Sequence, residues 1–322
     1  DWIPLTAFVE YKKQQTMSQS IWILGEALMD CIAQADGRLL PLMGGSPYNL
    51  ARAAALRGAR AGYLNPLSTD RFGDQLGAQI ERDGVQLLGG RSGLPTSLAV
   101  VQINQGQPSY GFYREGIADR DYTVADIVKK LQAAPTGVLH TGSLALVPPE
   151  TDKILAIVLE AKAMGWTISV DVNLRPKLAA DLGQYAHAVW QVVAQADWIK
   201  ASDEDMIALG LGDATLDNAP GFATHFAQHD ASRIALTFGA EGAYLQVAGQ
   251  SAALPVPEVQ VVDTVGAGDT FWGNCLADWV AQPDAAEARV ADTLHKAMLA
   301  AAINCTRAGC QPPTQAELLA AL

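Results

Sequence analysis

Short apolar segments with strand-like composition alternate with segments of helical periodicity along most of the chain. This alternation is typical of α/β proteins, in which helices cover both faces of a mostly parallel sheet. The sequence therefore predicts a doubly wound, mostly parallel sheet. The strand-like segments are 21–30, 60–68, 137–146, 167–175 and 196–202, segment 233–247 has the pattern of a hairpin, and the helical segments are 46–59, 73–85, 149–165 and a C-terminal region that begins near Gly268.

Two strand-rich segments, at about 30–43 and 94–115, interrupt this alternation because no helix follows their strands. The second contains TSLAVVQINQGQPSYGFYRE, in which apolar and polar residues alternate on either side of Gly106. Such a pattern predicts an antiparallel hairpin outside the parallel sheet. We expect a small β-sheet lid that closes over a ligand and excludes water. Its exposed edges can pair with a second copy, which predicts a homodimer through the lid.

Composition limits the partners and the compartment. The formal net charge of −12 argues against nucleic acid and against an anionic membrane surface, so an anionic ligand needs a local site. The chain has no apolar run long enough to span a membrane, and its four cysteines have no CxxC spacing. We therefore expect a cytoplasmic protein with residues 20–322 in one domain. Residues 1–19 are expected to be an extension, either a leader or an addition foreign to the native protein.

The segment VVDTVGAGDTFWGN (261–274) contains two glycines beside an acid. If a strand ends near Thr264 and a helix begins near Gly268, the amides of Gly266, Ala267, Gly268 and Asp269 lie at a helix N-terminus. Such amides bind anions, and glycines let the anion approach the backbone. A carboxylate there suits a base that takes a proton from a hydroxyl attacking phosphorus. The alternative is a capping acid in a tightly packed helix.

Several polar residues near predicted strand ends and glycine turns are candidates for binding a polyol. Gly44 and Gly45 precede a helix that carries Asn49, and Asp30 ends the apolar segment 21–30. The alternative for Gly44, Gly45 and Asn49 is a turn followed by an ordinary helix. The alternative for Asp30 is a solvated acid in a loop.

In DVNLRP, the polar residues Asp171, Asn173 and Arg175 are spaced by two and would share one face of a strand. Arg114 could reach the same ligand from the lid, although an isolated surface arginine is the simpler interpretation. The P-loop pattern is absent because the chain has no Gly-Lys pair, and GAGDTFWG lacks the spacing of a dinucleotide-binding loop.

Together these residues resemble the ribokinase-like (PfkB) family of carbohydrate kinases, over about 20–322. GGSPYNLARAAALRG and DTVGAGDTFWGN match its two signatures in order and separation. The resemblance implies a three-layer sandwich with a small lid, an anion hole at 266–268, and Asp269 as the base. It also implies that ATP and Mg²⁺ are cofactors and that a small-molecule sugar is the substrate, bound by Asp30, Gly45 and Asn49.

The same resemblance implies further sites. Thr237, Gly239 and Gly242 match the segment that lines the nucleotide, and Asp263 and Val265 match a K⁺ site in many members. The family's Asn-x-x-Glu motif is replaced here by Ser202 and Asp205, within KASDEDM, where Lys200 is a further candidate for nucleotide binding. The motifs most resemble bacterial fructokinases, which phosphorylate O6 of D-fructose. A 2-keto-3-deoxygluconate kinase and, more remotely, a catalytically silent sugar sensor are the alternatives.

Overall fold

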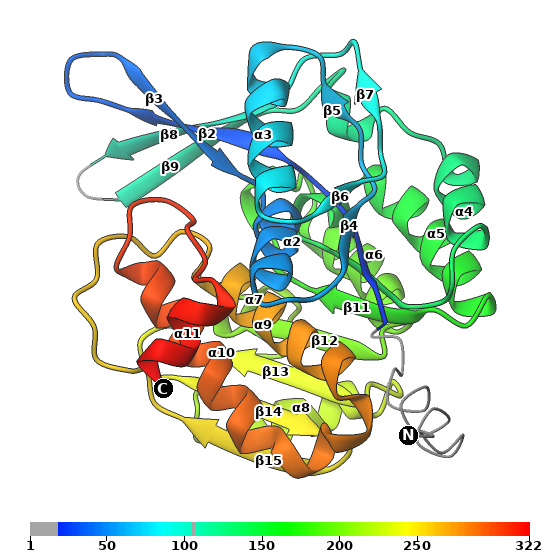
Figure 1. The fold of residues 1–322 in the computed structure, drawn as a ribbon, viewed down its shortest axis with the longest axis vertical. Helices are drawn as coiled ribbons and strands as arrows, with labels where there is room; N and C mark the ends of the chain where they lie inside the picture. The colour runs from blue at the N-terminus through cyan, green and yellow to red at the C-terminus, as the bar shows by residue number, and fades with distance from the viewer. Residues whose placement is uncertain (1–18, 105–106) are drawn as a thin grey trace, which may run out of the picture.

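The computed structural model describes residues 19–104 and 107–322, so the predicted extension at 1–19 lies almost wholly outside the described residues. A nine-stranded sheet forms the centre of the molecule, in the order β15-β14-β13-β12-β11-β10-β1-β4-β6 (Figure 1). Its strands are parallel from β13 to β6, whereas β14 and β15 are antiparallel. The strands are β1 (Ile21–Leu24), β4 (Ala61–Tyr63), β6 (Gln86–Leu87), β10 (Val138–Gly142), β11 (Thr167–Asp171), β12 (Trp198–Ser202), β13 (Arg233–Thr237), β14 (Ala243–Val247) and β15 (Gln250–Leu254).

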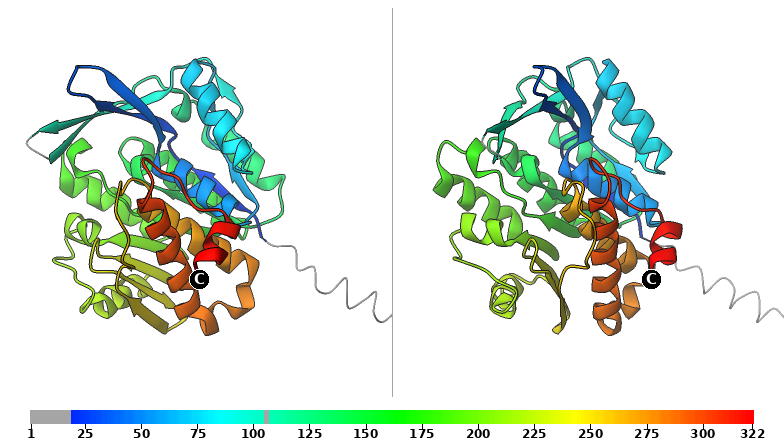
Figure 2. Two further views of the ribbon diagram at one scale, coloured as in Figure 1. Left: turned by 60° about the vertical axis from the view of Figure 1, so that its left-hand side comes forward. Right: turned by 90° about the vertical axis from the view of Figure 1, so that its left-hand side faces the viewer.

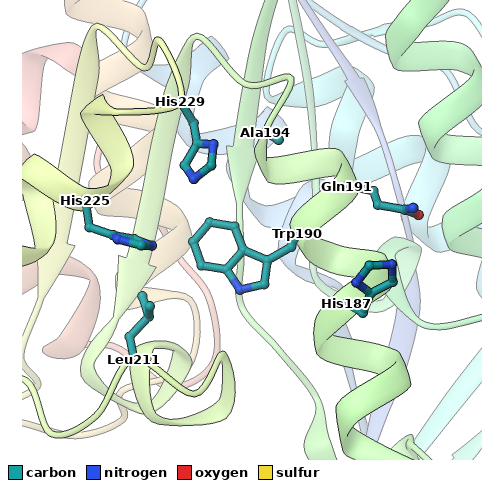
Figure 3. A pocket seen from close by; sticks show the side chains of 7 residues that line it. All are labelled: His187, Trp190, Gln191, Ala194, Leu211, His225 and His229. Carbon is teal, nitrogen blue, oxygen red and sulfur yellow. The ribbon is translucent and has the colours of Figure 1, made fainter.

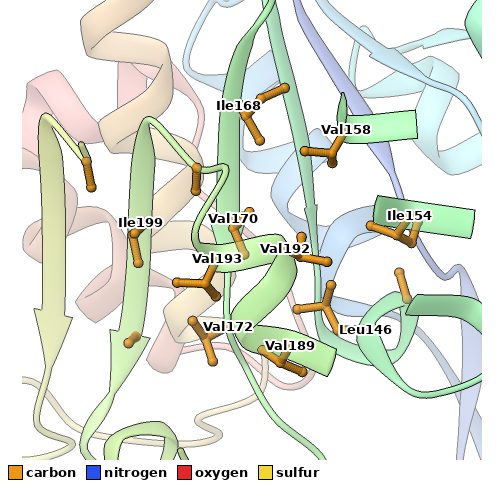
Figure 4. Packing of buried hydrophobic residues seen from close by; sticks show 14 of the residues in the cluster. Leu146, Ile154, Val158, Ile168, Val170, Val172, Val189, Val192, Val193 and Ile199 are labelled. Atoms are coloured by element: carbon orange, nitrogen blue, oxygen red, sulfur yellow. The ribbon is translucent and has the colours of Figure 1, made fainter. Parts of the chain in front are cut away.

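Helices cover both faces of this sheet, as the sequence predicts. One core packs sheet residues against helices that include α5 and α6, and Figure 4 shows Val170 beside Val192 and Val193. The other core packs α2, α3, α9 and α10 on the opposite face. Successive side chains of a strand point to opposite faces of the sheet. In β12, Trp198 therefore packs in the second core and Ile199 in the first. The helices are α2 (Ser46–Leu56), α3 (Arg71–Arg82), α4 (Val124–Gln132), α5 (Glu150–Ala163), α6 (Leu182–Val193), α7 (Asp203–Ala208), α8 (Ala219–Ala227), α9 (Ala267–Ala281), α10 (Val290–Cys305) and α11 (Gln315–Ala321).

A second, smaller sheet has the order β3-β2-β8-β9 and extends beyond the layered body (Figures 1 and 2). Strands β2 and β8 pair in parallel, and the outer pairs are antiparallel. The predicted small sheet and its hairpin are therefore confirmed, whereas closure over a ligand remains a prediction. The strands are β2 (Leu28–Ala33), β3 (Leu39–Gly44), β8 (Ser97–Asn104) and β9 (Gln107–Tyr113); β5 (Leu67–Ser68) and β7 (Arg91–Ser92) form a separate pair.

Several strand boundaries differ from the sequence-based prediction. Segment 21–30 is not one strand, because β1 ends at Leu24 in the large sheet and β2 begins at Leu28 in the small one. Asp30 therefore lies within the small sheet and not at the carboxyl edge of the large one. Segment 137–146 is a strand only to Gly142, after which a 3₁₀ turn follows.

A further difference concerns DVNLRP. Strand β11 ends at Asp171, and Asn173 has a left-handed φ of 38°. The spacing of two therefore does not place Asp171, Asn173 and Arg175 on one strand face. The predicted strand ending near Thr264 is also wrong, because residues 255–266 contain no strand and β15 ends at Leu254.

All four cysteines are free thiols, and Cys305 is the only one of them that is partly exposed. Within the described residues, no helix is both long and apolar enough to cross a bilayer.

Candidate active site

Helix α9 begins at the GAGD segment, as the sequence predicts. Its N-cap, Gly266, has a left-handed φ of 75°, and a Cβ there would lie 2.2 Å from Sγ of Cys310. Both observations require glycine. The Ala267 amide donates to the Thr264 carbonyl oxygen at 3.2 Å. The following amides lie in the first helical turn, which has no intrahelical acceptors for them and favours an anion.

Asp269 lies in this first turn, but its side chain does not cap its own helix. Oδ1 accepts a hydrogen bond from Ser46 Oγ at 2.6 Å, and Oδ2 accepts one from Asn49 Nδ2 at 3.0 Å. Burial raises the pKa of Asp269, while these two hydrogen bonds and the charges of Lys200 and Arg175 oppose that rise. The carboxylate is thus held by α2, the other signature segment, 220 residues or more away in sequence.

The glycines before α2 are explained by close contacts with acids. A Cβ at Gly44 would lie 2.1 Å from Oδ2 of Asp30, and one at Gly45 would lie 2.5 Å from the Glu26 carbonyl oxygen. Burial raises the pKa of Asp30 to about 6, with the charge of Arg175 lowering it and that of Asp269 adding to the rise. The predicted residues Asp30, Gly44, Asn49 and Asp269 are therefore close neighbours.

The two predicted arginines lie in different surroundings. Arg175 donates to Asn173 Oδ1 at 2.5 Å, and its charge affects both Asp30 and Asp269. Arg114 is almost buried at the end of β9, where it donates to the Leu144 carbonyl oxygen at 3.3 Å and pairs with Asp119 at 3.4 Å. It is therefore not an isolated surface arginine.

Glu26 was not singled out from the sequence, although it lies in segment 21–30, within GEALMD (25–30). Glu26 Oε1 accepts the Ser46 amide at 3.2 Å, and Oε2 has no hydrogen-bond partner among the described residues. Burial raises the pKa of Glu26 to about 7, opposed by the charges of Arg114 and Arg175. The charges of two arginines act on this buried acid, an arrangement that only the fold reveals.

Lys200 lies beneath the start of α9. Its Nζ would be 3.3 Å from a Cβ at Gly268, and it donates to both carboxylate oxygens of Asp171 at 2.9 and 3.0 Å. Both side chains are buried, and burial raises the pKa of Asp171 to about 6 against the opposing charge of Lys200. The arrangement holds a cation next to the helix N-terminus, where it favours a bound phosphate.

Ser202 and Asp205 form the capping box of α7. Asp205 Oδ2 accepts from the Ser202 amide and hydroxyl at 2.7 and 2.9 Å, and Oδ1 accepts from the Leu174 amide at 2.7 Å. Because Asp205 is buried and both its oxygens already accept hydrogen bonds, it does not fit a direct Mg²⁺ ligand here. Among the described residues, no group of three acids, histidines or cysteines could hold a metal. Mg²⁺ bound largely by ATP phosphates needs no such group.

The remaining predicted nucleotide residues lie at the end of β13 and in the turn after it. Thr237 is the register partner of Ser202, and Gly239 and Gly242 lie in the turn between β13 and β14. A Cβ at Gly242 would lie 2.1 Å from the Leu254 carbonyl oxygen. The predicted nucleotide segment thus borders β12 and the start of α7.

The predicted K⁺ residues join two loops near the start of α9. Asp263 accepts from the Val265 and Gly309 amides at 3.0 and 2.8 Å. The Val265 carbonyl oxygen accepts from Asn304 at 2.8 Å. Carboxylate and carbonyl oxygens are suitable donors for such a cation, so the residue types fit.

A surface cavity of about 490 Å³ lies between α6 and α8 and not beside Asp269 (Figure 3). Its lining includes Trp190, His225 and His229. The Trp190 ring lies 5.4 and 5.6 Å from the two imidazole centroids. None of the predicted site residues lines it, so we place the active site at α9.

Comparisons with known proteins identify the family of the chain. The family model of the pfkB family carbohydrate kinases matches residues 18–317. The chain belongs to this family. As a pfkB kinase it is an ATP-dependent sugar phosphotransferase with a ribokinase-like fold.

Relatives of this pfkB kinase are described as fructokinases. One from Vibrio alginolyticus is 31% identical over 314 residues, covering 93% of this chain and 97% of the relative. One from Rhizobium leguminosarum bv. trifolii is 31% identical over 259 residues, covering 79% and 77%. The structure of a fructokinase with bound ATP from Xylella fastidiosa has a TM-score of 0.82 at 27% identity, covering 94% of this chain and 98% of that one.

Proposed function

We propose that this pfkB kinase transfers the γ-phosphoryl group of ATP to O6 of D-fructose. The observation that carries the proposal is the position of Asp269. Its buried carboxylate lies in the first turn of α9, held by Ser46 and Asn49 and near Asp30. One helix end thus combines an anion-binding backbone with a base, which is the combination that phosphoryl transfer to a hydroxyl requires.

In this proposal Asp269 takes the proton of the sugar hydroxyl as that oxygen attacks phosphorus. Asp30, Asn49 and the backbone at Gly45 bind the other hydroxyls. Gly44 and Gly45 allow the close packing that this arrangement needs, because a Cβ at either position would collide with the Asp30 carboxylate or the Glu26 carbonyl oxygen. Catalysis then depends mainly on orientation and on stabilising charge.

The amides at the start of α9 and the ammonium group of Lys200 would stabilise the negative charge on the transferred group. Mg²⁺, when bound with ATP, would supply additional positive charge at the phosphates. Thr237, Gly239 and Gly242 would line the nucleotide, and K⁺ bound through Asp263 and Val265 would stabilise the loop before α9. The fructokinase from Xylella fastidiosa, whose structure contains ATP, supports the choice of nucleotide.

Charge supports a neutral sugar over a sugar acid. Near the site, the carboxyl groups of Glu26, Asp30, Asp119 and Asp269 face the guanidinium groups of Arg114 and Arg175. Both arginines are therefore already offset by acids. A 2-keto-3-deoxygluconate carboxylate would need an uncompensated cation, so fructose is the better match.

A coupled assay of ADP release tests this assignment. Wild-type protein with MgATP is offered D-fructose, 2-keto-3-deoxygluconate and D-ribose in parallel, and we expect the highest kcat/KM with fructose. Preference for the sugar acid would overturn the assignment. Fructose binding without ADP release would indicate a silent sensor instead.

We also propose that the small sheet mediates a homodimer and closes over the sugar. Leu39, Leu40 and Tyr113 on this sheet are 50%, 48% and 64% exposed. Burying such side chains against a second copy would remove apolar surface from water. Light scattering should give twice the chain mass, and a monomer at micromolar concentration would contradict the proposal.

A further inference from the structure

Ser46 links the two signature segments through a side chain to which neither the family match nor the sequence pattern assigns a role. It is the first residue of α2 and is 7% exposed. Its hydroxyl donates to Asp269 Oδ1 at 2.6 Å and accepts from Asn173 Nδ2 at 3.0 Å. We propose that Ser46 is a positioning residue that fixes the orientation of the Asp269 carboxylate. This inference rests on the proposed role of Asp269 as the base.

The backbone of Ser46 is fixed as firmly as its hydroxyl. Gly45, the N-cap of α2, provides no side-chain cap, and the Ser46 amide instead donates to Glu26 Oε1 at 3.2 Å. Pro47 follows and fixes its own φ at the start of the helix. Ser46 therefore presents its hydroxyl from a constrained position, with Glu26 on one side and Asn173 on the other.

The Ser46 hydroxyl also helps to fix the orientation of both oxygens of Asp269. Asn49 donates to Oδ2 at 3.0 Å, which is a longer contact than the one from Ser46 to Oδ1. Two donors on different oxygens prevent the carboxylate from rotating about its χ2 bond. Each oxygen keeps a lone pair that can accept the proton of a sugar hydroxyl. Loss of Ser46 Oγ would leave only the Asn49 contact to orient the base.

The same hydrogen bond favours the ionised form of Asp269, because a donor to a carboxylate stabilises its charge. Removing it should raise the pKa of Asp269 and move the acidic limb of the kcat profile to higher pH. Other charged or titratable groups also face Asp269 and would be unchanged. They are Lys200 from β12, Asp171 from β11, Arg175 after β11, Asp30 from β2 and Cys310 near the C-terminus.

The test compares Ser46→Ala with Ser92→Ala. Ser92 is a matched control, because it is also buried and its hydroxyl also donates to a carboxylate, Asp121, at 2.6 Å, but on β7. We expect Ser46→Ala to lower kcat about 10- to 100-fold, the equivalent of one hydrogen bond to a charged group, with little change in the KM for sugar. Its acidic limb should shift upward in pH, and Ser46→Thr, which keeps the hydroxyl, should restore both properties.

Thermal unfolding of each variant shows whether a loss of activity reflects loss of the fold. If folded Ser46→Ala keeps the wild-type kcat and pH profile, as Ser92→Ala should, the positioning role is wrong while the kinase assignment stands. If Ser46→Ala and Ser46→Thr lose activity equally without a shift in pH profile, the hydroxyl does not act through Asp269. If the wild type itself shows no sugar-dependent ADP release, the proposed function fails, and this role with it.

Discussion

Helices α7 and α9 both carry an acid in the first turn, but the two acids are used differently. At α7, the N-cap Ser202 and Asp205 bond to each other, and Asp205 caps its own helix. At α9 the N-cap is Gly266, which has no side chain to receive such a bond, and Asp269 instead bonds to Ser46 and Asn49 of α2. A glycine N-cap thus leaves both the helix amides and the acid available for a ligand.

The largest effect is expected from Asp269→Asn. We expect kcat to fall about 100-fold or more, because an amide cannot accept the proton, while the KM for ATP changes little. Steady-state kinetics measure both. Asp126→Asn is the control, since Asp126 occupies the same first-turn position in α4 but forms a capping box with Thr123. Near-normal turnover in Asp269→Asn would show that Asp269 is not the base and that it is no more important for catalysis than a capping acid.

Helix α2 extends the comparison, because it also has a glycine N-cap and relies on Glu26 from elsewhere in the chain. Burial raises the pKa of Glu26 to about 7 from 4.5. An acid with a raised folded-state pKa stabilises the protein below its unfolded pKa, and that stability is lost as the pH rises through about 7. The wild type should therefore lose roughly 3 kcal/mol more than Glu26→Gln between pH 4.5 and pH 8.

Urea unfolding at a series of pH values measures this difference. Glu26→Gln keeps an acceptor for the Ser46 amide, so its fold should be preserved. Parallel stability curves for the two proteins would show that Glu26 does not have the raised pKa that its burial implies.

The smallest effect is expected from Asp205→Ala. Loss of the α7 cap should lower the free energy of unfolding by about 1–2 kcal/mol, measured by denaturant unfolding. Turnover should remain within a few-fold of wild type, with the KM for MgATP little altered. A large rise in that KM at unchanged stability would instead give Asp205 a nucleotide role and make α7 resemble α9.

Local sequence patterns predicted helices and strands well in segments with a long, regular hydrophobic periodicity. The helices beginning at Ser46 and Ala267, and the hairpin of β13 and β14, follow the sequence closely. The break between β1 and β2 was not predicted, because residues 21–30 are mostly apolar on both sides of Gly25 and Glu26, and two short strands in different sheets have the same composition as one.

Residues of the candidate site could be proposed from the sequence where glycines and acids coincided, as at 266–269, but not where a contact joined distant segments. Ser46 lies within a quoted signature, yet a serine at the start of a helix is common as a cap. Its contact with Asp269 depends on how α2 and α9 pack together. Glu26 was missed for the same reason, since its burial and its exposure to the charges of two arginines depend on the tertiary fold.

The three residues between β1 and β2 couple any movement of the small sheet to the start of α2. The central sheet and the outer one are covalently continuous through Gly25, Glu26 and Ala27, and Glu26 also grips the first amide of α2. If the outer sheet swings as proposed, it would therefore pull on the start of α2, and through Ser46 on Asp269, the proposed base. Opening and closing would then change the orientation of the Asp269 carboxylate in each cycle. Binding of the sugar and alignment of the proposed base would therefore be coupled.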